Sequence, residues 1–288
     1  LIESKGGTVV ASAPAYGVMT ADLPLTALEA IAELDEVRSI RPMAESIPQK
    51  GSVSEGDVAH SAPAARNFYG ATGSGVSVGV ISDSVDYLAQ TQATGDLPAV
   101  TVLSDTSGTG EGTAMLEIVY DLAPDADLLF ASVLNGGPAG MANAIQSLTQ
   151  AGADIIVDDL FIYNQSPFQD DVIAQAAEDA ISAGVAYFTS AGNHGNRNDI
   201  TSSVFEGDYA SSGLPLNEPG TGSTYPDIHL FAPGVFYNEI LSSGKAYLFW
   251  SDALGASAND YDLLLYDVNF NFIAASTNIQ AGNDDPFE

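Results

Sequence analysis

The chain has 288 residues, 45% of them hydrophobic and none of them cysteine, so it can form one large or two smaller domains without disulfides or thiolate metal sites. Its 38 acidic and 7 basic residues give a net charge of −31, which makes nucleic acids and anionic lipid surfaces poor partners. No apolar run reaches the length of about 18 residues that a membrane-inserted helix requires. Such an acidic surface suits solubility in a saline or extracellular setting, or alternatively work at acidic pH.

Residues 1–45 are predicted to form a small α+β unit. Leu25, Leu28, Ile31 and Leu34 recur every third residue, which places them on one face of a helix. Strands are expected on both sides of that helix, over residues 8–12, 16–20 and 37–41. A linker and lead-in rich in Ser, Ala, Gly and Pro follows over residues 46–74.

From residue 75 the pattern changes to alternating strands and helices. The predicted strands are 76–81, 127–133, 154–160 and 185–189, and the predicted helices are 113–122, 139–151 and 171–183. This alternation indicates an α/β domain over residues 75–224, with a doubly wound parallel sheet and helices on both faces. Sites in such sheets lie beyond the carboxyl ends of the strands. Asp83, Glu111 and Asn193 each follow a predicted strand or begin a helix, so we expect them to converge there.

The last part of the chain, residues 225–288, favours antiparallel structure. Strand-like segments occupy residues 246–250, 261–266 and 272–276, with Asn-rich turns between the later ones. We therefore expect an antiparallel β-sandwich, inserted in the α/β domain or appended to it.

Three segments resemble the acid, base and oxyanion blocks of the subtilisin-like serine peptidases. They are Val78–Asp83 (VGVISD), Gly110–Met115 (GEGTAM) and Ser190–Gly195 (SAGNHG). The resemblance implies hydrolysis of peptides or proteins through an acyl-enzyme. It also implies that residues 1–45 are similar to a propeptide, with a processing site within residues 44–56, and that the C-terminal part is similar to the jelly-roll modules of bacterial members.

The resemblance assigns the general base to Glu111, where most subtilisin-like peptidases have histidine and the related sedolisins have glutamate. A carboxylate acts as a base when its pKa lies near the working pH, and a neighbouring carboxylate can raise that pKa by sharing a proton. Asp83 is the predicted neighbour, although a gapless overlay on the usual strand places Ser82 at the position of the orienting acid. The structural alternative for Glu111 is an acid favoured by the helix dipole.

Other side chains are assigned by the same resemblance. Asn193 is predicted to donate to the oxyanion, with a turn asparagine as its structural alternative. Asp158 and Asp159 end a core strand where the family lines its substrate cleft, so they are candidates for binding substrate or sharing a proton with Glu111. The structural alternative is that they cap the approach of Asp171 or face water. Glu117 and Asp121 have the four-residue spacing of the sedolisin Glu–Asp dyad and form an alternative catalytic pair, or else a solvated helix face.

The serine block of the family is missing from these residues. The nearest string, Gly220–Ser223, is followed by Thr-Tyr-Pro-Asp, which cannot begin a helix. We therefore expect the nucleophile to lie outside this sequence and the chain alone to be inactive; the alternative is a catalytically inactive relative used for binding or surface attachment. A plain α/β ligand-binding domain is a third interpretation, but no nucleotide-binding motif is present.

No cofactor or metal site is predicted. The histidines are scattered, and calcium bound by Asp252, Asp260 and Asp262 has only weak support because no spaced loop motif is present. A secreted, extracellular protein is expected from the family resemblance.

Overall fold

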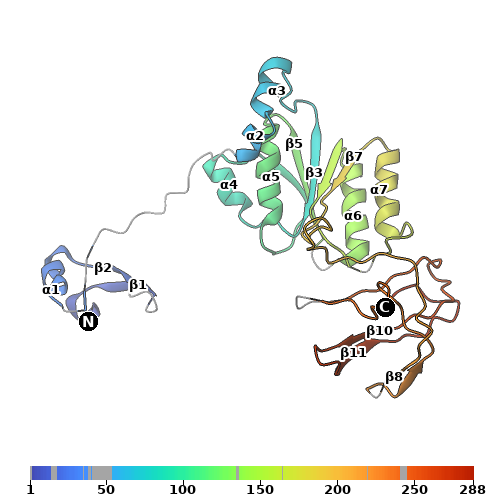
Figure 1. Ribbon diagram of the computed structural model, residues 1–288. Helices are drawn as coiled ribbons and strands as arrows, with labels where there is room; N and C mark the ends of the chain where they lie inside the picture. Colours follow the sequence, from blue (N-terminus) through green and yellow to red (C-terminus); the bar gives the residue numbers. More distant parts are fainter. Residues whose placement is uncertain are drawn as a thin grey trace. The chain divides into compact units, whose positions relative to one another are not determined.

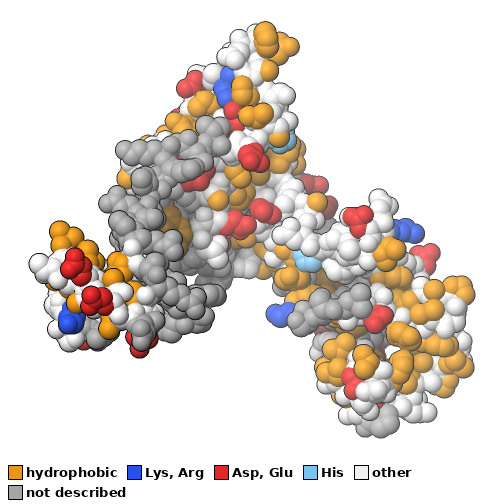
Figure 2. All heavy atoms as spheres, turned by 60° about the vertical axis from the view of Figure 1, so that its left-hand side comes forward, with side chains coloured by type: hydrophobic (Ala, Val, Ile, Leu, Met, Phe, Trp, Pro, Cys, Tyr) orange, Lys and Arg blue, Asp and Glu red, His pale blue; other side chains and the backbone are white. Residues whose placement is uncertain are grey.

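The structure, a computed structural model, describes residues 2–13, 18–34, 36, 37, 40, 54–133, 136–163, 165–218, 220–240 and 245–288. The chain divides into two compact units, Leu1–Lys50 and Gly51–Glu288. Among the described residues, no helix is both long and apolar enough to cross a bilayer. Acidic side chains are spread over the visible face of the α/β region, and basic ones are few (Figure 2).

The first unit pairs two antiparallel strands and follows them with a short helix. Strands β1 (Thr8–Ala13) and β2 (Val18–Asp22) confirm the first two predicted strands, with an irregularity in the register between Val9 and Ala11. A 3-10 helix, η1 (Glu3–Lys5), precedes them, and η3 (Leu25–Ala27) leads into α1 (Leu28–Ala32). Ile31 is buried as predicted, but Leu25 is exposed because it begins the 3-10 turn. Most of the predicted strand over residues 37–41 and most of the expected processing region lie outside the described residues.

A five-stranded parallel sheet organises the second unit, which confirms the predicted α/β fold (Figure 1). Its strands are β3 (Ser77–Ser82), β4 (Val100–Ser104), β5 (Asp127–Ser132), β6 (Ile155–Asp158) and β7 (Ala186–Thr189), in the order β4-β5-β3-β6-β7. Strand β3 is central and buried along almost its whole length, as its continuous apolar sequence predicts. The edge strand β4 and the helix before it are absent from the sequence-based prediction; most of β4 is exposed.

Helices cover both faces of this sheet. On one face, α4 (Leu88–Thr94) and α5 (Glu111–Leu122) pack over a core built around Leu116 and Phe130. On the other face, α6 (Gly137–Gln150) and α7 (Val172–Ser182) pack over a core built around Ile145 and Ile156. Figure 1 shows these two helical layers with the sheet between them. The expected helices at 113–122, 139–151 and 171–183 are therefore confirmed within a few residues at each end.

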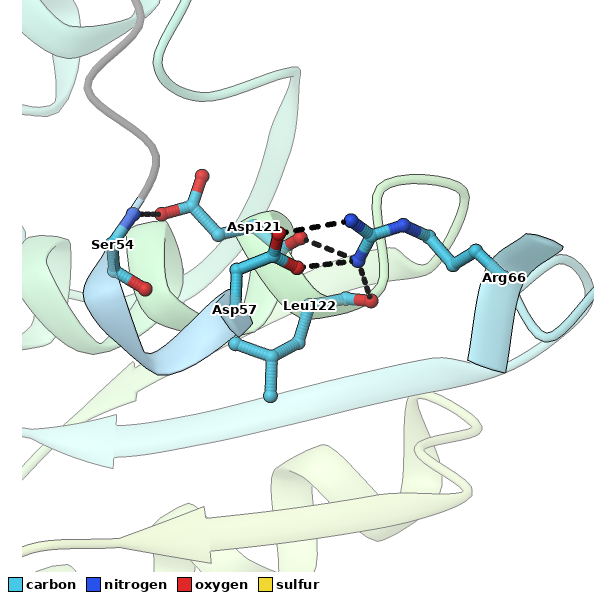
Figure 3. Close-up of polar contacts among 5 residues, drawn as sticks. All are labelled: Ser54, Asp57, Arg66, Asp121 and Leu122. Carbon is cyan, nitrogen blue, oxygen red and sulfur yellow. Dashed lines mark hydrogen bonds and ion pairs between the residues drawn. The ribbon is translucent and has the colours of Figure 1, made fainter. Parts of the chain in front are cut away.

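Two further helices lie within residues 46–74, where the sequence favoured a linker and lead-in. They are α2 (Glu55–Ala59) and α3 (Ala62–Tyr69). Arg66 of α3 donates from both terminal nitrogens to the carboxylate of Asp57, at 2.6 and 3.1 Å, and to the carbonyl oxygens of Asp121 and Leu122 at 3.0 and 2.9 Å (Figure 3). Because these carbonyls end α5, one guanidinium both caps that helix and fixes α2 and α3 against it.

The C-terminal part is antiparallel, as predicted, but its strands are short. Strand β8 (Leu216–Glu218) pairs with β9 (Ser223–Tyr225), and β10 (Leu263–Tyr266) pairs with β11 (Phe272–Ser276). The segment 246–250, predicted as a strand, pairs only over a short stretch with residues 286–288: Phe249 bridges Phe287, and Leu248 and Glu288 exchange main-chain hydrogen bonds at 2.7 and 2.9 Å. Its aromatic residues also form ring contacts, such as Phe249 on Phe287 with ring centroids 4.9 Å apart.

Candidate functional site

The carboxyl edge of the sheet gathers the residues that the sequence singled out. Strands β3 and β6 are parallel neighbours in which Ile81 pairs with Asp158, and Asp158 pairs in turn with Thr189 of β7. Helix α5 begins at Glu111 beside the residues that follow β3, since the main-chain N–H of Glu111 donates to Asp83. Asp83, Glu111, Asp158 and the loop after β7 therefore share one edge, as the parallel topology requires.

The carboxylate of Asp83 holds the N-terminus of α5. It accepts hydrogen bonds from the main-chain N–H of Ser84 (2.5 Å) and of Glu111 (3.1 Å), and from both the main chain and the hydroxyl of Thr109, the latter at 2.6 Å. Burial raises the pKa of Asp83, but these hydrogen bonds outweigh it and hold that pKa below its usual range. Asp83 is thus an ionised helix-capping group in the folded protein.

Replacing Asp83 with asparagine should lower the free energy of unfolding by about 1.5–3 kcal/mol at pH 7, because donors aimed at a carboxylate would face an amide. The folded-state pKa of Asp83 is depressed, so its stabilising contribution is complete above the unfolded-state pKa and disappears as pH falls through the folded-state value. Urea unfolding at a series of pH values checks both statements. The exposed Asp125→Asn serves as the control, and equal stability of the two variants at pH 7 would contradict this role.

The side chain that contacts the Glu111 carboxylate is Ser82. The Ser82 hydroxyl is fully buried and donates to Glu111 Oε2 at 3.1 Å, whereas the Glu111 residue itself is exposed. The Asp83 carboxylate instead accepts from the main-chain N–H of Glu111, so it does not share a proton with the Glu111 carboxylate. Ser82, which the gapless overlay places at the position of the orienting acid, thus contacts the Glu111 carboxylate, whereas Asp83 contacts the Glu111 main chain. The catalytic roles of Glu111 and Asp83 remain predictions.

Two glycines around Glu111 explain why the chain folds this way locally. Gly110 precedes α5 with a φ of 84°, in the left-handed region that favours glycine, and its N–H donates to the Ser84 hydroxyl at 2.9 Å. Gly112 is buried where a Cβ atom would lie 2.3 Å from Cε2 of Phe130. The Gly-Glu-Gly sequence thus lets the start of α5 lie directly against the sheet while the carboxylate between the glycines stays exposed.

Asp158 is the most buried acid at this edge, with 3% of its surface exposed. Its carboxylate accepts hydrogen bonds from the Tyr187 hydroxyl at 2.7 Å and the Thr189 hydroxyl at 2.8 Å, both from β7. Burial raises the pKa of Asp158; the hydrogen bonds from Tyr187 and Thr189 oppose this shift without reversing it. The neighbouring Asp159 is exposed, so the two predicted cleft residues have different environments.

Asn193 lies in the loop that follows β7, and it is exposed. That loop is fixed at the carboxyl edge by the Ser190 N–H, which donates to the main-chain oxygen of Asp158 at 3.2 Å. It is also held by His194, whose ring lies 4.4 Å from that of Phe161 in the loop after β6. The structure thus places Asn193 at the expected edge, and its role as an oxyanion donor remains a prediction.

The alternative dyad lies further along α5. Glu117 and Asp121 follow Glu111 by six and ten residues, which corresponds to about 9 and 15 Å along a helix axis. Burial, together with the negative charges of Asp96 and Asp121, raises the pKa of Glu117. The Asp121 carboxylate accepts from the Ser54 N–H at the far end of the helix (Figure 3). Glu111 therefore begins α5, whereas Glu117 and Asp121 lie in its second half.

Two other features that the sequence raised are the calcium site at Asp252 and the serine string that ends at Ser223. Asp252 accepts from Asn259, Ala258 and Ser257, and within the described part of the chain no group of three His, Cys, Asp or Glu residues could hold a metal ion. Ser223 is the first residue of β9, so it begins a strand and not a helix, in agreement with the sequence analysis.

The fold and site together define an α/β protein with a glutamate at a helix N-terminus beside the carboxyl edge of a parallel sheet. No protein-family model matches the chain, and no curated protein matches it. Solved structures similar to it include the prenylagaramide maturation protease PagA (19% identity, TM-score 0.38), the self-cleaved protease domain of PatA (20%, 0.32) and MycP1 with its N-terminal propeptide removed (17%, 0.34). The similarity covers 46%, 43% and 60% of this chain and 52%, 52% and 56% of those chains, so the chain spans about half their length.

Proposed function

We propose that this chain carries the base and oxyanion part of a subtilase-like, serine-type endopeptidase that uses glutamate as its general base. The observation that carries the proposal is the Ser82–Glu111 hydrogen bond, which fixes an exposed carboxylate at the carboxyl edge of the sheet. A side chain held in this way can accept a proton from an attacking hydroxyl. The Gly-Glu-Gly-Thr-Ala-Met and Ser-Ala-Gly-Asn-His-Gly segments support the assignment to this family.

In the proposed reaction, Glu111 takes the proton of a serine hydroxyl as its oxygen attacks the peptide carbonyl. Asn193 donates a hydrogen bond to the oxygen that becomes negative in the tetrahedral intermediate. The protonated Glu111 then gives its proton to the leaving amine, and water repeats the sequence to release the acyl group. Ser82 orients the Glu111 carboxylate, and Asp83 holds the helix start that positions it.

The 288 residues contain no Gly-Thr-Ser string, so no residue of this chain is assigned as the nucleophile. The same observation favours the second candidate, a catalytically inactive protein of this fold used for binding. A fluorophosphonate probe, which reacts covalently with activated serines, separates the two. The peptidase proposal expects the full-length protein to be labelled and to cleave unfolded casein; neither would occur in an inactive relative.

We expect casein hydrolysis by the full-length protein to persist at about pH 5, where a histidine base with a pKa of about 6.5 is mostly protonated. A carboxylate base remains ionised at lower pH than an imidazole, so the acid limb of the pH–rate profile moves to lower pH. A histidine-dependent subtilisin measured in the same assay is the control. A profile confined to alkaline pH would contradict Glu111 as the base.

A further inference from the structure

A pocket lies beyond the ends of β6 and β7, on the face of the sheet that α6 and α7 cover. Its volume of about 370 Å³ falls within the range of small-molecule sites, which is roughly 300–1,000 Å³. Apolar side chains from α6, α7 and the loop after β6 form most of its walls: Met141, Leu160, Ile162, Ile173, Ala174 and Ala177. Polar residues between β6 and α7 also line it: Gln165, Ser166, Gln169 and Asp171. The apolar walls suit an apolar chain of several carbon atoms.

The polar end of the pocket is an acid without a cation. Asp158, Tyr187 and Thr189 line it, and the groups that donate to the carboxylate, which are two hydroxyls and the Leu160 main-chain N–H, are all neutral. Buried carboxylates are normally paired with a positive charge, because desolvation of an unpaired charge is costly. No basic side chain occurs among the described residues that line the pocket.

We propose that this pocket binds an alkylammonium group, in the form of a lysine side chain of a peptide. The methylene stem would bury against the apolar walls while the ammonium reaches Asp158. A carboxylate has about four acceptor positions; the two hydroxyls use one on each oxygen, and the Leu160 main-chain N–H uses a third. The position that is left favours the compact ammonium over a guanidinium, whose planar fork needs both oxygens in one geometry.

The pocket and the proposed base lie at the same carboxyl edge of the sheet, on its two opposite faces. Asp158 pairs with Ile81, and the next residue of β3 is Ser82, whose hydroxyl contacts Glu111. Ile81 and Ile156 belong to the core under α6 and α7, and alternation along each strand directs Asp158 to that face and Ser82 to the α5 face. A peptide bound along this edge would place a lysine in the pocket beside the bond presented to Glu111. The assignment to a peptide's lysine rests on the proposed function; binding of an alkylammonium does not.

Binding of n-pentylamine and 1-pentanol, measured by calorimetry at pH 7, tests the site without any catalytic step. The two probes have similar apolar chains, and we expect the amine to bind roughly tenfold more tightly because of its charge-assisted hydrogen bond to Asp158. Asp158→Asn should abolish this preference, while Asp159→Asn, which changes the exposed neighbouring acid, should retain it. Equal affinity of the wild-type protein for both probes would overturn the proposal, as would an undiminished preference in Asp158→Asn. N-propylguanidine binding more tightly than the amine would overturn the choice of ammonium.

Two further measurements keep the test decisive if Asp158→Asn fails to fold. Amine affinity should fall as pH is lowered, because burial raises the pKa of Asp158 and protonation removes its charge. Three other titratable groups lie near Asp158: Tyr187 of β7, the pocket-lining Asp171 and the adjacent Asp159. The fall in amine affinity at low pH must therefore persist in Asp159→Asn. Ala177→Leu should fill the pocket and weaken both probes; unchanged binding would place them elsewhere.

The outcomes separate this site from the peptidase proposal. A protein that prefers the amine but never cleaves casein keeps the pocket assignment and loses the catalytic one. A protein that cleaves casein but shows no preference for the amine keeps the catalytic assignment and loses the pocket assignment.

Discussion

Replacing Glu111 with glutamine should reduce the kcat for casein hydrolysis by the full-length protein by about 10²–10⁴-fold, the usual contribution of a general base. Glutamine has nearly the same shape and keeps an oxygen that can accept the Ser82 hydroxyl, so the helix start should remain in place. The amide cannot take up the proton of the attacking hydroxyl. We therefore expect the loss in kcat with little change in KM, measured with a fluorogenic casein substrate at several concentrations.

Glu117→Gln is the matched control, because it makes the same chemical change on the same helix. Glu117 lies six residues further along α5, away from the carboxyl edge, and should contribute little to kcat. A large loss in Glu117→Gln with near-normal turnover in Glu111→Gln would transfer the base to the alternative pair of Glu117 and Asp121. Near-normal turnover in both variants would exclude either glutamate as the base.

Replacing Gly112 with alanine should lower the free energy of unfolding by about 3 kcal/mol, at the upper end of the usual cost of overpacking a core. Alanine normally stabilises a helix relative to glycine by roughly 0.5–1 kcal/mol, so a loss of stability in Gly112→Ala would reveal the close contact at this position. At Gly112 the added Cβ would lie 2.3 Å from Cε2 of Phe130 and 2.6 Å from the main-chain oxygen of Ser84. Phe130 is fully buried and the Ser84 oxygen belongs to the backbone, so α5 itself must move away.

Gly140→Ala provides the matched comparison in α6. Its added Cβ would meet the Val133 oxygen at 3.6 Å, an ordinary van der Waals contact, so this variant should be unchanged or more stable by about 0.5–1 kcal/mol. Urea unfolding followed by circular dichroism measures both variants under the same conditions. A Gly112→Ala protein as stable as Gly140→Ala would show that α5 does not depend on this close contact.

Periodicity in the sequence determined most of the regular structure of the second unit. The buried run of β3 and the helix-spaced apolar residues of α5 predict those elements because each pattern matches the burial that its element requires. Hydrophobic periodicity was less informative for elements whose side chains are mostly exposed, and β4, which is one of these, is absent from the prediction. Residues 246–250 show the opposite case, since this apolar segment pairs with residues 286–288 over a short stretch only and its rings form aromatic contacts.

The sequence by itself also determined which segments meet, because parallel strands bring their carboxyl ends to one edge, where Asp83 follows a strand, Asp158 ends one and Glu111 begins a helix. Only the tertiary structure decided which side chain contacts which. Adjacent residues of a strand face opposite sides, so a register difference of one residue exchanges Ser82 and Asp83 beside Glu111. The surroundings of the Asp158 carboxylate were likewise decided by packing, since no local pattern shows that two hydroxyls of β7 donate to it beside a mostly apolar pocket.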